Sequence, residues 1–208
     1  MRKVVLDIET TGLHLDTNKI FEIGCVELWE NIPTGNYFHV YINPTIPLSK
    51  ESIEITGITD DILINKPLFN EIKNEFLEFL QEDPIIAHNS DFDSSFIYKE
   101  LGYKLPNLII DSLAIARKQF PGKKNNLDAL CKRFHVDNST RTVHGALLDA
   151  DLLAKIYYFL TISNEDIYLN NQIDDVQYTY IPQKKIELTN EEQLSHIYFI
   201  EKYKLKSF

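Results

Sequence analysis

Features that stabilise proteins outside the cytoplasm are scarce in this chain. Only two cysteines occur among its 208 residues, Cys25 and Cys131, which are too few and too far apart for a disulfide framework. The longest apolar runs are far shorter than the roughly 20 residues that a membrane-spanning helix requires. Asp7 follows only three apolar residues near the N-terminus, so we expect no signal peptide. These absences predict a cytoplasmic protein with no membrane partner.

The motifs of several enzyme classes are also missing. The six histidines and two cysteines form no Cys-x-x-Cys or His-x-x-x-His pair, which excludes the common zinc sites. The sequence contains neither a glycine-rich phosphate loop nor a Gly-x-Ser-x-Gly nucleophile elbow. A P-loop nucleotidase and an α/β-hydrolase are therefore excluded.

Basic side chains are outnumbered, since 21 lysines and arginines face 31 aspartates and glutamates, which gives a formal net charge of −10. This balance at first argues against a nucleic-acid partner, because binding to phosphates usually requires a basic surface. The charge is unevenly distributed, however. Residues 99–141 contain nine basic and four acidic side chains, a net charge of +5, which leaves −15 for the rest of the chain. The negative net charge therefore does not exclude a nucleic-acid partner.

The sequence predicts a folded α/β domain. Hydrophobic residues make up 44% of the chain and aromatic residues 12%, which excludes a wholly disordered protein. Short apolar runs predict strands at 4–8, 20–29, 37–42, 85–87 and 108–110, with a turn at 33–36 and a loop-rich connection over 44–60. Helices are expected at 68–80, 92–101, 113–118, 127–134 and 146–160. Three strands followed by alternating strands and helices predict a mixed five-stranded sheet with flanking helices.

The composition changes after Leu160, which separates the expected domain, residues 1–162, from a C-terminal extension. Residues 163–185 are polar and lack periodicity, as in a flexible linker. Residues 186–208 are expected to form a final helix, because Thr189 and Glu192 make a capping box before an apolar stripe. A lone helix with such a stripe suits docking into a partner's groove. The alternative is a disordered terminus.

Two acidic residues end the first predicted strand. Asp7 and Glu9 are two positions apart, so their side chains project from the same face of the sheet. They could be surface acids on a solvated edge strand. The apolar run over residues 4–8 instead indicates a buried strand, in which two close carboxylates repel each other unless they are paired or bind a metal. This pair therefore favours a divalent cation, and hard carboxylate oxygens suit Mg²⁺ or Mn²⁺.

Further acids open the two helices expected at 92–101 and 146–160. Asp91 and Asp93 lie about 200° apart on a helix, so at most one can face Asp7 and Glu9; simple helix capping is the alternative role for this segment. His144 and Asp149 differ by about 140° of helical rotation, so they cannot share a helix face. We therefore place His144 on the preceding loop, above a site that contains Asp149.

These segments together resemble the three motifs of the DEDDh 3′–5′ exonuclease family. The first motif is matched by residues 7–13, the second by residues 88–93 and the third by His144 with Asp149. The similarity continues through residues 111–117, 120–125 and 127–131 and covers about residues 3–162. Within the family, the run is most similar to the proofreading subunits of bacterial replicative DNA polymerases.

The resemblance implies an RNase H-like fold and hydrolysis by two divalent cations, Mg²⁺ or Mn²⁺. It assigns Asp7, Glu9, Asp93 and Asp149 as metal ligands and His144 as the general base. It also implies contacts with the substrate through Asp7, Glu9, Asp149, Glu51 and Thr56, the last two with the terminal nucleotide. In such a mechanism two cations about 3.5–4 Å apart hold the scissile phosphate while a histidine removes a proton from water.

The function implied is removal of mismatched 3′-terminal nucleotides from DNA during replication, with release of nucleoside 5′-monophosphates. Residues 186–208 would tether the domain to the polymerase subunit, and Ile167–Leu169 in the linker is a candidate peptide for the sliding clamp. A frayed end is favoured because a mismatch lowers the cost of unpairing. The alternatives are a free-standing DEDDh exonuclease that acts on RNA or small oligonucleotides, and a binding subunit whose acidic site is only structural.

Overall fold

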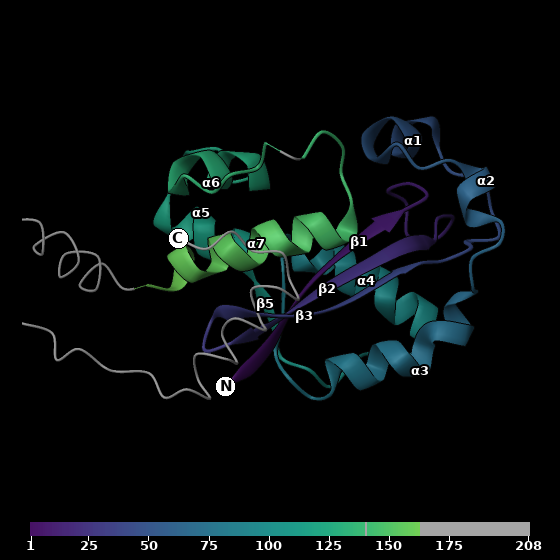
Figure 1. Cartoon of the computed structure of the whole chain (residues 1–208), viewed down its shortest axis with the longest axis horizontal. Coiled ribbons are helices and arrows are strands. Elements are labelled where there is room, and N and C mark those ends of the chain that lie inside the picture. The colour runs from purple at the N-terminus through teal and green to yellow at the C-terminus, as the bar shows by residue number, and fades with distance from the viewer. Residues whose placement is uncertain (140, 163–208) are drawn as a thin grey trace, which may run out of the picture. The chain divides into compact units, whose positions relative to one another are not determined.

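A computed structural model of the chain describes residues 1–139 and 141–162, and its core is a five-stranded sheet (Figure 1). The strand order is β3-β2-β1-β4-β5. The strands are β1 (Arg2–Thr10), β2 (Ile20–Trp29), β3 (Ile32–Tyr41), β4 (Ile85–Ala87) and β5 (Ile109–Asp111). The sheet is mixed, because β2 pairs antiparallel with β1 and β3, whereas β4 pairs parallel with β1 and β5 pairs parallel with β4. This confirms the predicted fold class.

Seven helices occur within the described residues. They are α1 (Lys50–Thr56), α2 (Asp60–Leu63), α3 (Phe69–Leu80), α4 (Ser90–Leu101), α5 (Ser112–Gln119), α6 (Leu127–Phe134) and α7 (Ala146–Thr161). No helix in this part of the chain is long and apolar enough to cross a membrane. The predicted linker, residues 163–185, and the predicted final helix, residues 186–208, lie outside the described residues.

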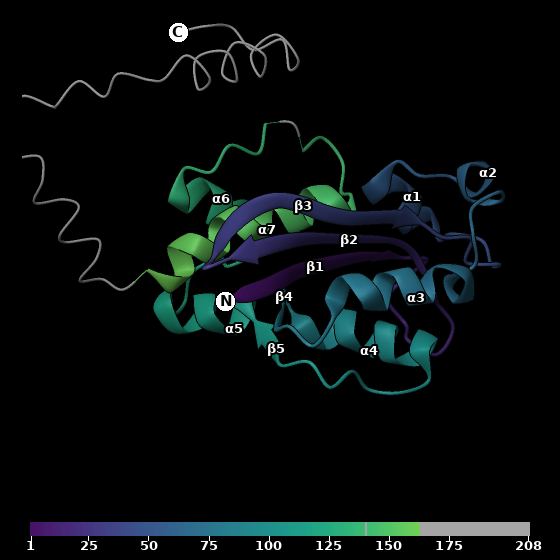
Figure 2. The same ribbon diagram turned by 60° about the horizontal axis from the view of Figure 1, so that its bottom comes forward.

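Helices cover both faces of the sheet (Figure 2). Val4, Leu6 and Ile8 of β1 pack against α3 and α4 in one apolar cluster. Val5 lies on the opposite face, in a second cluster that contains residues of α7. Because side chains alternate along a strand, Asp7 and Glu9 share the face of Val5 and therefore point to the side of the sheet that α7 covers.

The turn between β2 and β3 lies earlier than predicted. Glu30 and Asn31 have φ angles of 48° and 67°, and two consecutive residues with positive φ are typical of a tight hairpin turn. The predicted turn at residues 33–36 is wrong, because these residues belong to β3. Proline and glycine are tolerated there since β3 is an edge strand.

The expected loop over residues 44–60 contains two short helices, α1 and the start of α2, which the sequence did not reveal by periodicity. Helix α1 is defined by its ends. Ser49 accepts a hydrogen bond from the backbone N–H of Ser52, and Gly57 ends the helix at φ 70°. Seven residues are too few for an apolar repeat to stand out, so the caps were the available signal.

Gly24 allows α7 to approach the sheet closely. A Cβ atom at this position would lie 2.3 Å from the backbone nitrogen of Leu147, a distance that no side chain tolerates. Gly24 is the cross-strand partner of Asp7 in the antiparallel pair of β1 and β2. The absent side chain therefore brings the first turn of α7, which contains Asp149, directly over the strand next to Asp7.

Candidate active site

Three elements supply the predicted acids to one end of the sheet. Asp7 and Glu9 come from β1, Asp93 from the first turn of α4 and Asp149 from the first turn of α7. Asp93 and Asp149 are each only 5% exposed. Asp91, by contrast, is exposed to solvent. The structure thus buries one of the two acids that begin α4 and leaves the other on the surface.

The carboxylates influence one another's ionisation. Burial raises the pKa of Asp7 well above its ordinary value, and repulsion from Asp93 and Glu9 adds to the effect. Burial raises the pKa of Asp93 to about 8, and that of Glu9 to about 7. Three crowded carboxyl groups that resist ionisation indicate a place where positive charge is needed.

Asp149 differs from the other three acids because it has positive partners. Nε of Arg141 lies 2.5 Å from Oδ1 of Asp149, and Nη2 lies 2.7 Å from Oδ2. Nδ1 of His144 is 3.1 Å from the same Oδ2. Burial alone would raise the pKa of Asp149, but the hydrogen bonds from Arg141 and His144 outweigh it and lower this pKa.

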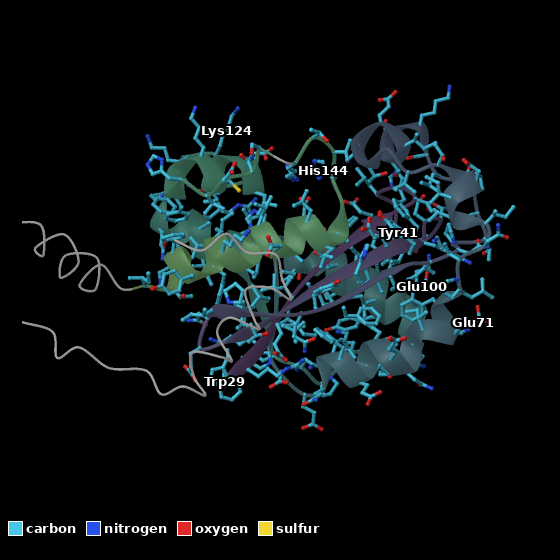
Figure 3. The ribbon with its side chains drawn as sticks, viewed as in Figure 1. Trp29, Tyr41, Glu71, Glu100, Lys124 and His144 are labelled. Atoms are coloured by element: carbon cyan, nitrogen blue, oxygen red, sulfur yellow. The ribbon has the colours of Figure 1, made fainter. Side chains whose placement is uncertain are left out.

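His144 lies on the loop before α7, between α6 and α1 (Figure 3). Its backbone N–H donates to the carbonyl of Ile55 in α1 over 2.9 Å, so the loop is fixed by the main chain. Its imidazole side chain is 46% exposed and can therefore meet a ligand from solvent. The hydrogen bond to Asp149 raises the pKa of His144 above its ordinary value.

The donor atoms suit a divalent cation. Glu9, His144 and Asp149 each offer a ligand atom within 4.8 Å of the others. Asp7 and Asp93 bring further carboxylate oxygens to the same cluster, as their mutual repulsion shows. In proteins, Mg²⁺ and Mn²⁺ bind to hard oxygen donors such as carboxylates whose negative charge is not fully neutralised by positive side chains. The residues present therefore fit the cation that the sequence predicts.

The comparisons with known proteins agree with this arrangement. The family described as "Exonuclease" (RNase_T) matches residues 4–157, which is most of the chain and spans all four acids and His144. The chain belongs to the exonuclease family. The predicted family and the predicted exonuclease function are thereby confirmed.

Individual proteins similar to this exonuclease cover most of its length. "DNA polymerase III subunit epsilon" of Buchnera aphidicola is 44% identical and aligns with 85% of this chain and 78% of its own. The protein of the same name from Rickettsia typhi is 40% identical over 97% of this chain and 96% of its own. A solved structure described as "Exonuclease X in complex with 5' overhanging duplex DNA" is 25% identical, has a TM-score of 0.62 and covers 79% of this chain and 96% of that one.

Two residues predicted to contact the substrate lie on α1 of the exonuclease. Thr56 is 3% exposed, and its hydroxyl donates to the carbonyl of Ser52 over 2.8 Å. Glu51 lies in the first turn of α1 and is exposed. Within the described residues, no hydrogen bond or ion pair joins either side chain to the four acids, so their contact with a nucleotide stays a prediction.

Two residues of the exonuclease site were not predicted from the sequence. Arg141 was counted only among the basic residues of its segment, although it precedes His144 by three positions. Glu22 lies opposite Glu9 on β2, is 2% exposed and pairs with Nε2 of His39 at 2.8 Å. Its charge contributes to the raised pKa values of Asp7 and Glu9. The available signal was an acidic residue between the apolar Phe21 and Ile23 in the predicted strand.

The raised pKa values predict how the stability of the cation-free exonuclease depends on pH. Glu9 and Asp93 bind protons in the folded state up to pKa values of about 7 and about 8, whereas in the unfolded chain they release them near pH 4. We expect the free energy of unfolding to fall as the pH rises from 5 to 8, by up to about 1.4 kcal/mol per pH unit for each group.

Thermal unfolding in EDTA between pH 5 and pH 8.5 measures this dependence. Asp93→Asn removes one of the carboxyl groups whose pKa is raised and should give a flatter curve, while the exposed Asp91→Asn should behave as the wild type. Asp149 has a lowered pKa in the folded state, so its ionisation makes the free energy of unfolding rise with pH. This effect is confined to pH values below about 4, the pKa of an aspartate in the unfolded chain, and therefore lies outside the measured range. A melting temperature that rises with pH would contradict the burial of these carboxyl groups.

Proposed function

We propose that this exonuclease removes mismatched 3′-terminal nucleotides from DNA in the 3′–5′ direction and releases nucleoside 5′-monophosphates, as a proofreading subunit during replication. The observation that carries this proposal is the meeting of Asp7, Glu9, Asp93 and Asp149 beside His144 at one end of the sheet. Support for the replicative role comes from relatives that bear the name of a DNA polymerase III subunit.

The four acids would hold two divalent cations, Mg²⁺ or Mn²⁺. Such cations, when bound, supply positive charge to the scissile phosphate and make water a better nucleophile at neutral pH. The protein contributes the fixed positions of the ligands. Asp7 and Glu9 are held by the sheet, and Asp149 is held by an α7 that packs tightly over Gly24.

His144 would act as the general base. Its Nδ1 lies beside the Asp149 carboxylate, so Nε2 would take the proton from the attacking water. The Asp149 carboxylate stabilises the imidazolium that results, which the raised pKa of His144 reflects. A histidine whose ring is half exposed can then release this proton to solvent.

Selection of mismatched ends would need no recognition of particular bases. A terminal nucleotide has to be unstacked and unpaired before its phosphate reaches the acids, which costs a few kcal/mol, and a mismatch lowers that cost. The end that is already frayed is therefore cleaved faster. The polymerase would supply this end, since an acidic protein with a net charge of −10 binds DNA weakly on its own.

We further propose that the domain, residues 1–162, is tethered to the polymerase through the C-terminal extension. Residues 186–208 would bind the alpha subunit of DNA polymerase III, residues 163–185 would serve as a flexible linker, and Ile167–Leu169 would contact the sliding clamp. What supports this is the capping box and apolar stripe of residues 186–208 in the sequence.

One experiment tests both proposals. Primer–template DNA with a paired or a mismatched 3′ end is digested in Mg²⁺ by the full chain and by a chain that lacks residues 186–208, each with and without the alpha subunit. Without that subunit, both proteins should prefer the mismatch by about tenfold or more, because each 1.4 kcal/mol of unpairing that a mismatch saves is worth a factor of about ten. The alpha subunit should stimulate the full chain only.

The same assay with RNA primers covers the principal alternative. Equal rates on paired and mismatched DNA, or faster digestion of RNA, would overturn proofreading in favour of a free-standing exonuclease. Equal stimulation of the two chain lengths by the alpha subunit would overturn the tether and leave the proofreading activity standing.

A further inference from the structure

Arg141 has its guanidinium group inside the acidic site. Its side chain is only 7% exposed, although the residue lies on a loop. Two of its nitrogens reach the two oxygens of Asp149, at 2.5 and 2.7 Å, and Nη2 also lies 2.9 Å from Nδ1 of His144. Nη1 lies 2.7 Å from Oδ1 of Asp128, in the first turn of α6. A permanent positive charge is thus fixed on one of the four candidate metal ligands.

We propose that Arg141 is a positioning residue that occupies the Asp149 carboxylate when no cation is bound and gives it up when a divalent cation binds. This inference rests on the proposed function, because it takes Asp149 to be a cation ligand. It adds that the cation and the guanidinium compete for the same two oxygens.

The competition follows from geometry and charge. A two-pronged pair between arginine and carboxylate uses both oxygens along the directions in which they accept best. A cation that binds Asp149 needs at least one of these oxygens, and it also repels the guanidinium at short range. Glu9 and His144 offer their ligand atoms within 4.8 Å of those of Asp149, so the cation would bind next to the group that it displaces.

Asp128 gives Arg141 a second anchor. It is much more exposed than Asp149, at 58% against 6% for the side chains, so its carboxylate remains hydrated and available. Nδ2 of Asn138 donates to the same Oδ1 of Asp128 over 3.1 Å and fixes its position. When the guanidinium leaves Asp149, it can stay bonded to Asp128, and the loop remains attached to α6.

The contact has a clear benefit in the cation-free protein. Asp149 is buried near three other carboxyl groups, and a buried charge without a partner is strongly destabilising. Arg141 neutralises this charge until a cation does so. A purely structural ion pair would also stabilise the protein, but its contribution would not depend on whether a cation is present.

Cation binding without DNA separates these two roles. Mn²⁺ is titrated calorimetrically into the full-length wild type, Arg141→Met and Arg133→Met, and thermal unfolding is recorded in EDTA and in Mn²⁺. Arg133 is a matched control, because its guanidinium donates to Asn125 and to the carbonyl of Lys124 and has no acidic partner within the described residues.

We expect Arg141→Met to bind Mn²⁺ at least about tenfold more tightly than the wild type, because a charge-assisted competitor for Asp149 has been removed. Its melting temperature in EDTA should fall below that of the wild type, and Mn²⁺ should restore most of the loss. Arg133→Met should match the wild type in Mn²⁺ affinity. If Arg141→Met does not fold in EDTA, Arg141→Lys takes its place in the test. Lysine keeps the positive charge but cannot contact both oxygens of Asp149, so this variant should bind Mn²⁺ more tightly than the wild type and less tightly than expected for Arg141→Met.

Equal or weaker Mn²⁺ binding by Arg141→Met, or a loss of stability that Mn²⁺ leaves unchanged, would overturn this inference and leave the cation site intact. Absence of Mn²⁺ binding in the wild type would overturn the assignment of the four acids as well. The two failures are therefore distinguishable within one titration series.

Discussion

Asp7→Ala is expected to fold normally and to lose exonuclease activity to the background of the assay. Asp7 lies at the centre of the acidic cluster, where repulsion from Asp93 and Glu9 adds to burial in raising its pKa. Loss of a ligand should exceed the roughly 10- to 100-fold cost of altering a group that only supports a ligand. The fold should persist, because removal of one of several repelling carboxylates relieves strain in the cation-free protein.

Digestion of 5′-labelled single-stranded DNA in Mg²⁺, together with thermal unfolding in EDTA, measures both parts of this expectation. Asp91→Ala is the matched control, since Asp91 is an exposed acid on the same helical turn as Asp93. It should retain wild-type activity and stability. Near-full activity of folded Asp7→Ala would refute the assignment of this carboxylate as a cation ligand.

His144→Ala is expected to reduce the rate about 10²- to 10⁴-fold, the usual contribution of a general base. The substitution leaves the main-chain hydrogen bond from residue 144 to Ile55 in place, so the loop should keep its position. The wild-type rate should rise with pH through the raised pKa of His144, because only the neutral ring accepts a proton. The variant should lack this step.

Single-turnover rates between pH 5.5 and pH 9 provide the measurement for His144→Ala. His135→Asn is a suitable control, because His135 is exposed on the same connection and has a φ of 55°, a conformation that asparagine also adopts. If the rate of His144→Ala falls only a few fold, or if its pH profile is unchanged, His144 is not the general base.

The sequence was informative wherever a local pattern decides the structure. The runs at 20–29 and 85–87 became β2 and β4, and the helix predicted at 127–134 became α6 with the same bounds. The prediction was wrong where two short segments close together in the sequence could each form the turn. Pro33 and Gly35 indicated a turn, but the chain turned at Glu30 and Asn31, of which only Asn31 is a typical turn residue, because the pairing of β2 with β3 decides the register.

In the candidate site, too, local spacing predicted some residues, whereas others depend on tertiary contacts. Spacing established that Asp7 and Glu9 share a face, but it could not choose between Asp91 and Asp93, which depends on how α4 packs against β1. Arg141 and Glu22 depend on tertiary contacts alone. Arg141 meets Asp149 only after the loop folds back over α7, and Glu22 becomes an interior acid only because β2 lies beside β1. No window of neighbouring residues contains that information.

Gly24 contributes to the active site although it has no side chain, because it lets the backbone of α7 approach β2 closely. The distance between the carboxylates of Asp7 and Asp149 is set by how near two backbones can come, and that clearance is smaller than a methyl group. The relative positions of these carboxylates thus depend on the absence of a side chain at position 24 as well as on the acidic residues themselves. A catalogue of reactive side chains would pass over position 24, although the spacing of the acids on β1 and α7 is determined there.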